Sequence, residues 1–320
     1  KDPVRLEKMR LESVKLNAFV ARWKPRLADM RRNAIYYIRA SSFCNKDILG
    51  PKFFKTQLDT LDTDEFLTAI CAIRHKEVTN KFFINYDHAK HQFKDSYKYE
   101  SILRLNLKDR FILTAEYLLH YDPHEPLYMG YDPGNFQSLI VAQKKDYGRR
   151  LDIIKEFFAF LPKDYNDLVA EVHQFFGSAA VNKTIYLYPD RAGNKRREER
   201  EQITTDSLNL KAALESYGFM VILYNEDAPT IYHWQQFKLC QMLFGERSPL
   251  LPVIRIDENE CKNLCSAIMI SPLKKTDGKI ELDKSSEKKQ QLKNQAGLTA
   301  QLPSAMIYLL YGLYSDAVKA

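Results

Sequence analysis

The segment MGYDPGN, Met129–Asn135, joins a short apolar run to an aspartate and then to a sharp Pro-Gly turn. This pattern is typical of a β-strand that ends in an acidic residue at the edge of a sheet. The segment TIYLYPD, Thr184–Asp190, repeats the pattern, and Gly193 turns the chain shortly afterwards. If the two strands are neighbours in one sheet, Asp132 and Asp190 lie close together.

The sequence around these two segments predicts an α/β domain. Three closely spaced strands favour an antiparallel meander, and the helix-strand alternation that follows favours parallel crossovers. This is the order of an RNase H-like fold, a mixed β-sheet flanked by helices. The expected strands are residues 127–131, 138–144, 151–160, 184–188 and 219–224, and the expected helices are 165–176 and 207–217.

The domain boundary is expected near a linker-like turn, Tyr121–Pro126. Residues 1–122 are predicted to form a mainly helical segment, with a helix over Lys52–Ile73 that is interrupted by a turn at Asp62–Asp64. Residues 123–320 then form the sheet domain. A lysine-rich stretch inside that domain contains Thr276-Asp277-Gly278-Lys279, which predicts a hairpin turn.

The composition is that of a folded intracellular protein. Of the 320 residues, 45% are hydrophobic and 12% aromatic, which is enough apolar material for a substantial core. No apolar run is long enough to span a membrane, and the first ten residues lack the apolar segment of a secretory signal. The odd number of cysteines, five, fits a reducing compartment. Cys261 and Cys265 share a helical face, but with no second Cys or His pair nearby we expect buried thiols and not a zinc site.

The net charge of +7 is moderate for a nucleic-acid enzyme, so the distribution of the basic residues is more informative. They gather just after Asp190 and again beyond Ser271, where the alternative is a solvated surface. The residues expected to contact a DNA backbone are Lys195, Arg196, Arg197, Lys284, Lys288 and Lys289.

Asp132 and Asp190 are the candidate catalytic and metal-binding residues. Taken alone, an Asp-Pro-Gly turn is more often structural, but two carboxylates side by side repel each other unless a divalent cation lies between them. Mg²⁺ and Mn²⁺ prefer carboxylate and water ligands. A pair of such ions would activate a water and stabilise the leaving 3′ oxygen during hydrolysis of a phosphodiester.

These residues resemble the nuclease domain of the large terminase subunit of tailed phages or prophages. The resemblance rests on Tyr131-Asp132-Pro133-Gly134, on Asp190 followed by Gly193, and on a basic loop before a C-terminal helix. The upstream stretch Tyr37–Asn45 also resembles the end of a terminase ATPase domain. No Gly-x-x-x-x-Gly-Lys-Ser/Thr phosphate loop occurs, so this chain is not expected to hydrolyse ATP.

The resemblance implies a metal-dependent endonuclease of a genome-packaging motor that cuts concatemeric double-stranded DNA. It also implies a location in the host cytoplasm and, in the full motor, the portal and the small terminase subunit as partners. The family supplies a third acid near the start of its C-terminal helix, where this chain has Ser304. A hydroxyl is a poor metal ligand, so Asp283 is the expected third catalytic and metal-binding residue, with Asp316 or no third ligand as alternatives.

Three other interpretations stay open at this point. A nuclease of the same fold, of the resolvase or transposase type, differs mainly in its C-terminal region. A DNA-binding module with impaired catalysis would follow from loss of the third acid. An ATP-binding domain of the actin and sugar-kinase fold also places Asp-x-Gly after a strand, but the 11 glycines include no second glycine-rich phosphate loop.

Overall fold

The computed structural model describes residues 42, 46–60, 70, 80–103, 112–190, 197–199, 202–224, 232–276, 279–288 and 295–319. Contacts divide the chain into two compact units, Lys1–Glu77 and Val78–Ala320. In the first unit the described helix is α2 (Lys46–Thr60), which bends at Gly50, where φ is 70° and Pro51 follows. The helix therefore begins earlier than the expected Lys52, and the turn expected at Asp62–Asp64 lies outside the described residues.

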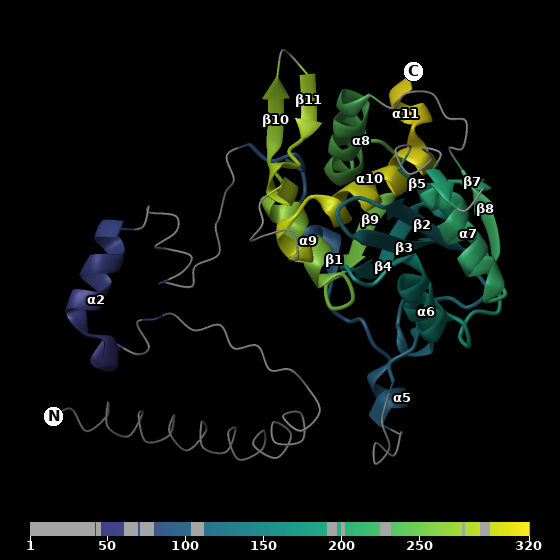
Figure 1. The fold of residues 1–320 in the computed structure, drawn as a ribbon, viewed down its shortest axis with the longest axis horizontal. Coiled ribbons are helices and arrows are strands. Elements are labelled where there is room, and N and C mark those ends of the chain that lie inside the picture. The colour runs from purple at the N-terminus through teal and green to yellow at the C-terminus, as the bar shows by residue number, and fades with distance from the viewer. Residues whose placement is uncertain are drawn as a thin grey trace. The chain divides into compact units, whose positions relative to one another are not determined.

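The second unit is built on a seven-stranded sheet with the order β1-β9-β4-β3-β2-β5-β8 (Figure 1). β3 runs antiparallel to both of its neighbours, and every other adjacent pair is parallel. The strands are β1 (Gln92–Phe93), β2 (Leu127–Asp132), β3 (Gln137–Lys145), β4 (Arg150–Ala159), β5 (Thr184–Pro189), β8 (Met220–Leu223) and β9 (Val253–Asp257). The predicted mixed α/β sheet of the RNase H-like type is confirmed.

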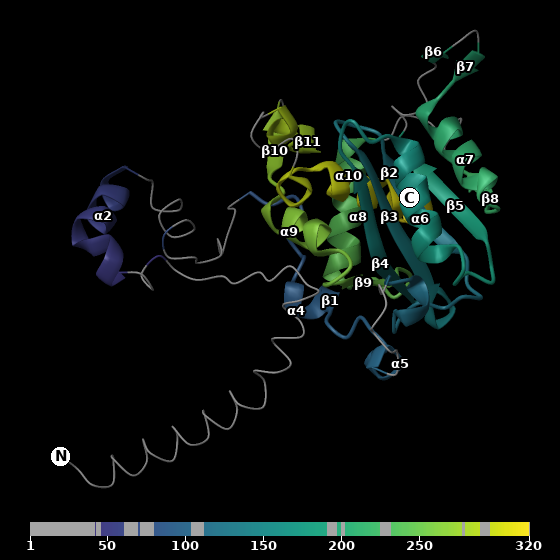
Figure 2. The ribbon, with the colours of Figure 1, turned by 60° about the horizontal axis from the view of Figure 1, so that its bottom comes forward.

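Helices cover both faces of this sheet (Figure 2). One face carries α8, α9 and α10, and the opposite face carries α6 and α7. The longer helices are α6 (Tyr165–Phe176), α7 (Asp206–Ser216), α8 (His233–Gly245), α9 (Lys262–Ile270) and α10 (Gln301–Tyr314), and the shorter ones are α4 (His88–His91), α5 (Tyr99–Leu103) and α11 (Asp316–Lys319). No helix of the described part is long and apolar enough to cross a membrane.

Two small hairpins lie outside the main sheet. The first pairs β6 (Arg197–Glu199) with β7 (Gln202–Thr204). The second pairs β10 (Leu273–Thr276) with β11 (Lys279–Leu282), so the hairpin expected around residues 276–279 is present. A short 3₁₀ helix over Ser285–Lys288 follows the second hairpin.

Strand periodicity decides which face each side chain meets. Leu127, Met129 and Tyr131 are fully buried against the core under α6 and α7. Successive side chains of a strand point to opposite faces, so Gly130 and Asp132 belong to the face under α10. At Gly130 the helix lies directly on the strand, because a Cβ there would be 2.1 Å from the carbonyl oxygen of Ala305.

The second unit begins well before the boundary that the sequence suggested at 122/123. Phe82 and Phe83 are almost completely buried in the core under α8 and α10. Strand β1 pairs with β9 at the edge of the main sheet, and Leu118 and Tyr121 pack on the α6 face. The described residues between 80 and 122 therefore pack as part of the sheet unit.

Candidate active site

Asp132 and Asp190 lie at the ends of two hydrogen-bonded parallel strands. β2 and β5 are paired up to Tyr131 and Pro189, and the backbone N–H of Asp190 donates to the carbonyl oxygen of Tyr131 at 2.8 Å. Each aspartate is two residues beyond a residue that faces α10, Gly130 in β2 and Tyr188 in β5. The two carboxylates therefore share one face and one edge of the sheet, and their charges interact.

The Asp132 carboxylate is deeply recessed. The residue is 2% exposed, and this burial raises the pKa of Asp132 to about 6, although the nearby Lys284 acts against the rise and Asp190 adds to it. The ammonium of Lys284 lies 3.4 Å from Oδ2 of Asp132. Lys284 thus supplies positive charge where the sequence placed a metal ion.

Two further residues complete this group, and the sequence analysis assigned neither of them a role. The Tyr308 hydroxyl on α10 hydrogen-bonds to Asp190, and the pKa of Tyr308 is raised by burial and by the two aspartates. Burial also raises the pKa of Glu287 to about 7, and its charge interacts with Lys284 and Asp132. The Oε1 atom of Glu287 is sealed from solvent and has no hydrogen-bond partner among the described residues.

Lys284 is held by all three acids. Burial acts to lower its pKa, but the carboxylates of Asp132, Glu287 and Asp190 raise the pKa of Lys284 above its ordinary value. Its ammonium also lies 5.9 Å from the ring centre of Tyr308. Three carboxylates facing one ammonium leave an excess of negative charge at this edge of the sheet, which favours binding of a cation.

The other expected site residues lie in different surroundings. Asp283 comes directly after β11, and its Oδ1 accepts from the backbone N–H of Ser285 at 2.8 Å, so it caps the short 3₁₀ helix. Ser304 donates to the carbonyl oxygen of Ala300 within its own helix. Asp316 begins α11 and interacts with Tyr311.

The expected DNA-contacting residues divide into three groups. Lys195, Arg196 and Lys289 lie outside the described residues, and for Arg197 only its backbone place at the start of β6 is described. Lys284 pairs with Asp132, as given above. Lys288 is exposed, at the end of the 3₁₀ helix that carries Glu287.

No family model matches this sequence, and no curated protein matches it. Solved structures with a similar fold include the full-length large terminase of a thermophilic bacteriophage, at 11% identity and a TM-score of 0.43, covering 82% of this chain and 52% of that one. The nuclease domain of the P22 large terminase matches at 9% identity and a TM-score of 0.40, covering 71% of this chain and 97% of that domain. The large terminase nuclease of the thermophilic phage G20c, solved with bound cobalt, matches at 12% identity and a TM-score of 0.39, covering 70% and 97%.

The chain is similar in fold to the nuclease domains of phage large terminases. It spans about half the length of the full-length large terminase, 52% of that chain.

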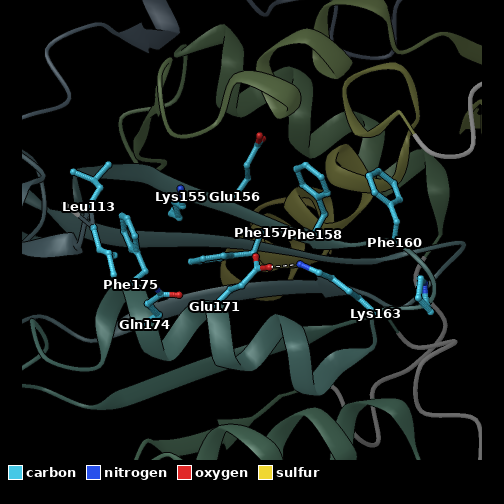
Figure 3. Close-up of a pocket in the computed structure, with 12 residues that line it drawn as sticks. Leu113, Lys155, Glu156, Phe157, Phe158, Phe160, Lys163, Glu171, Gln174 and Phe175 are labelled. Carbon is cyan, nitrogen blue, oxygen red and sulfur yellow. Dashed lines mark hydrogen bonds and ion pairs between the residues drawn. The ribbon is translucent and has the colours of Figure 1, made fainter. Parts of the chain in front are cut away.

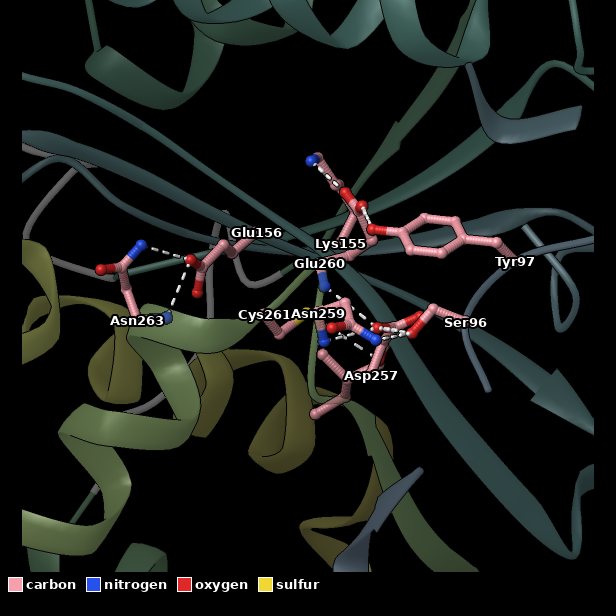
Figure 4. Close-up of polar contacts among 10 residues, drawn as sticks. Ser96, Tyr97, Lys155, Glu156, Asp257, Asn259, Glu260, Cys261 and Asn263 are labelled. Atoms are coloured by element: carbon pink, nitrogen blue, oxygen red, sulfur yellow. Dashed lines mark hydrogen bonds and ion pairs between the residues drawn. The ribbon is translucent and has the colours of Figure 1, made fainter. Parts of the chain in front are cut away.

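A second cluster of buried acids in the sheet unit differs from the first because its carboxylates are satisfied by the protein (Figure 4). Oδ1 of Asp257 accepts from Ser96 Oγ at 2.6 Å and from two backbone N–H groups. Glu260 pairs with Tyr97 and Lys155. Such a network stabilises the junction between β1 and β9 and keeps these two carboxylates engaged within the protein.

Glu156 of strand β4 belongs to the same cluster and has a structural role. Its carboxylate accepts from the backbone N–H groups of Asn263 and Leu264 at 3.0 and 2.7 Å, and from the Asn263 amide at 2.7 Å (Figure 4). The residue therefore satisfies the free N–H groups at the start of α9. Cys261 and Cys265, at the same helix, are buried thiols whose pKa is raised by burial, as expected from the sequence.

A cavity of about 760 Å³ lies away from the carboxylate pair, over β4 and α6 (Figure 3). Its lining is mainly aromatic, including Phe157, Phe160 and Phe175. Both carboxylates in the lining have partners, because Glu156 caps α9 and Glu171 pairs with the ammonium of Lys163 at 2.8 Å. This cavity therefore does not compete with the Asp132 site as a candidate centre for catalysis.

Proposed function

We propose that this chain is the nuclease part of a viral genome-packaging protein, an endonuclease that hydrolyses double-stranded DNA with a divalent metal ion. One observation carries the proposal: Asp132 and Asp190 end adjacent strands on one face of an RNase H-like sheet, beside Glu287. The packaging role, with a portal and a small terminase subunit as partners, comes from the resemblance of the sequence to large terminases.

The residues present fit Mg²⁺ or Mn²⁺ in charge and donor chemistry. The unpartnered Oε1 of Glu287 and the recessed carboxylate of Asp132 are oxygen donors in excess of the local positive charge. Among the described residues, however, no group of three or more His, Cys, Asp or Glu side chains is close enough to hold an ion. Water and phosphate oxygens would therefore complete the coordination, as is usual for Mg²⁺.

Asp132, Asp190 and Glu287 are the residues that would hold the metal. We propose Glu287 as the third acid because Asp283 is already engaged in capping Ser285. When bound, the metal supplies an activated water and neutralises charge on the departing 3′ oxygen. Attack of that water on phosphorus breaks the bond to the 3′ oxygen and leaves a 5′-phosphate and a 3′-hydroxyl.

The neighbouring side chains have positioning roles in this proposal. The Tyr308 hydroxyl orients the Asp190 carboxylate through its hydrogen bond. Lys284, held beside Asp132, places a positive charge where the scissile phosphate would arrive. Lys288 lies on the same short helix and is exposed, so it is suited to contact the phosphate backbone.

Plasmid cleavage tests the proposal. With Mn²⁺ the protein should nick or linearise supercoiled plasmid, and either Asp132→Ala or Asp190→Ala should slow cutting by about a hundredfold or more. The matched control is Glu171→Ala, which removes a partly exposed acid of α6 on the opposite face of the sheet. Cutting that is unchanged in either aspartate variant would rule out the assignment, and DNA binding without any metal-dependent cutting would favour a DNA-binding module.

A further inference from the structure

A cavity of about 350 Å³ adjoins the carboxylate site. It lies between the start of α8, the β10–β11 hairpin with its following loop, and α10. Lys284 and Tyr308 form part of its wall, and the same two side chains contact Asp132 and Asp190. Any group that fills the cavity is therefore next to the proposed scissile phosphate.

The lining combines hydrogen-bond donors and acceptors. Gln236 lines the cavity and is 7% exposed, and the Nδ1 atom of His233 lies 3.3 Å from its Oε1. The carboxylates of Glu281 and Asp283 also line the cavity. Two carboxylates repel a bare phosphate, but they accept hydrogen bonds from the amino group of a base, and a glutamine amide pairs with an adenine edge.

The depth of Asp132 supplies a second, independent argument. This carboxylate is 2% exposed, so a phosphate of a regular duplex, flanked by stacked base pairs, reaches it only if the strand is deformed. Turning one nucleotide out of the stack costs a few kcal/mol in a duplex and less where the base is already unpaired. A cavity beside the site that binds the displaced base offsets that cost.

We propose that this cavity receives one unpaired nucleobase of the strand that is cut, so that the substrate class is DNA with a locally unpaired nucleotide next to the scissile phosphate. The inference rests on the proposed nuclease function. The cavity volume, about 350 Å³, is at the small end of the range for small-ligand sites and suits a single nucleotide. Gln236 and His233 are then specificity residues that contact the base.

Binding of two matched duplexes without metal tests the proposal. The duplexes are identical except that one carries a single extra, unpaired nucleotide, and EDTA prevents cutting. The full chain should bind the bulged duplex about tenfold more tightly, the scale of one stacked and hydrogen-bonded base. His233→Ala, at an exposed position, and Gln236→Leu should bring the two affinities together and leave the affinity for the perfect duplex unchanged.

Two controls accompany these variants. Gln174→Leu, a glutamine on α6 that lines the aromatic cavity of Figure 3, should keep the preference for bulged DNA. Unfolding midpoints by circular dichroism identify loss of fold in Gln236→Leu, and the exposed His233 variant then decides. Equal affinity of the native protein for both duplexes, or a preference that persists in His233→Ala, overturns the proposal.

Titration calorimetry distinguishes a base from a phosphate as the occupant. Deoxyadenosine and deoxycytidine monophosphates should bind, and deoxyribose 5-phosphate should bind at least about tenfold more weakly. Equal binding of all three would assign the cavity to phosphate and overturn the base assignment. A protein that prefers bulged DNA but cuts no plasmid with Mn²⁺ loses the nuclease function alone, whereas one that cuts without any such preference loses the base cavity alone.

Discussion

Replacing Gly130 by alanine tests whether α10 rests directly on strand β2. The added Cβ would lie 2.1 Å from the carbonyl oxygen of Ala305 and 2.8 Å from Cβ of Leu309, whereas ordinary van der Waals contact begins at 3.4 Å. The helix must therefore retreat by about 1.3 Å, the difference between 3.4 and 2.1 Å, because a backbone carbonyl cannot rotate away. Overpacking of this kind costs about 1–3 kcal/mol, which in a domain of this size lowers the Tm by roughly 2–12 °C.

The assay is urea unfolding followed by circular dichroism, with Gly297→Ala as the control. A Cβ at Gly297 meets the Asn263 side chain at 3.3 Å, so only a small adjustment is needed. Displacing α10 also moves Tyr308 away from Asp190, so Mn²⁺-dependent cutting should fall further in Gly130→Ala than in the control. An unfolding free energy for Gly130→Ala within about 0.5 kcal/mol of the native protein would refute the reasoning.

Two other predictions concern single side chains. Glu287→Gln should weaken Mn²⁺ binding in titration calorimetry because it removes the charge from a sealed, unpartnered carboxylate, whereas Asp283→Asn should leave that binding nearly unchanged; equal losses would contradict the choice of Glu287. Burial lowers the pKa of His91 below 6.5, so the unfolded chain takes up the proton more readily and stability should decline as the pH falls below about 6.5, by up to about 1.4 kcal/mol per pH unit. His91→Leu should remove this component in urea unfolding at pH 5 and 7, although Glu246 at 3.6 Å opposes it, and the exposed His88→Leu should retain it; identical pH profiles for the two variants would count against the assignment.

The strands and helices of the sheet were predictable because their apolar patterns are local. The helix expected over 165–176 has the observed bounds, since Asp164 and Asp167 form a capping box at its start. The expected strand at 127–131 extends by one residue to Asp132. The domain boundary differed because the turn at Tyr121–Pro126 resembles a linker, although it lies inside the sheet unit.

The site was predictable only in its strand-borne half. Asp132 and Asp190 each end an apolar strand, and that local pattern was enough to expect them together. Glu287 stands in a stretch of charged residues whose pattern is that of a solvated loop, and its burial depends on contacts with segments far away in the sequence. The pairing of Lys284 with Asp132 spans 152 positions for the same reason, so composition could indicate a basic loop but not its carboxylate partner.

The late position of α10 in the chain affects how the protein is made. Strands β2 and β5 leave the ribosome well before residues 301–314, whose apolar side chains later cover them. A nascent chain therefore holds both aspartates in finished strands while Tyr308 and the covering helix are still missing. We expect such a chain to need protection from aggregation on its uncovered sheet face, and to stay unable to damage DNA until synthesis has passed the last helix.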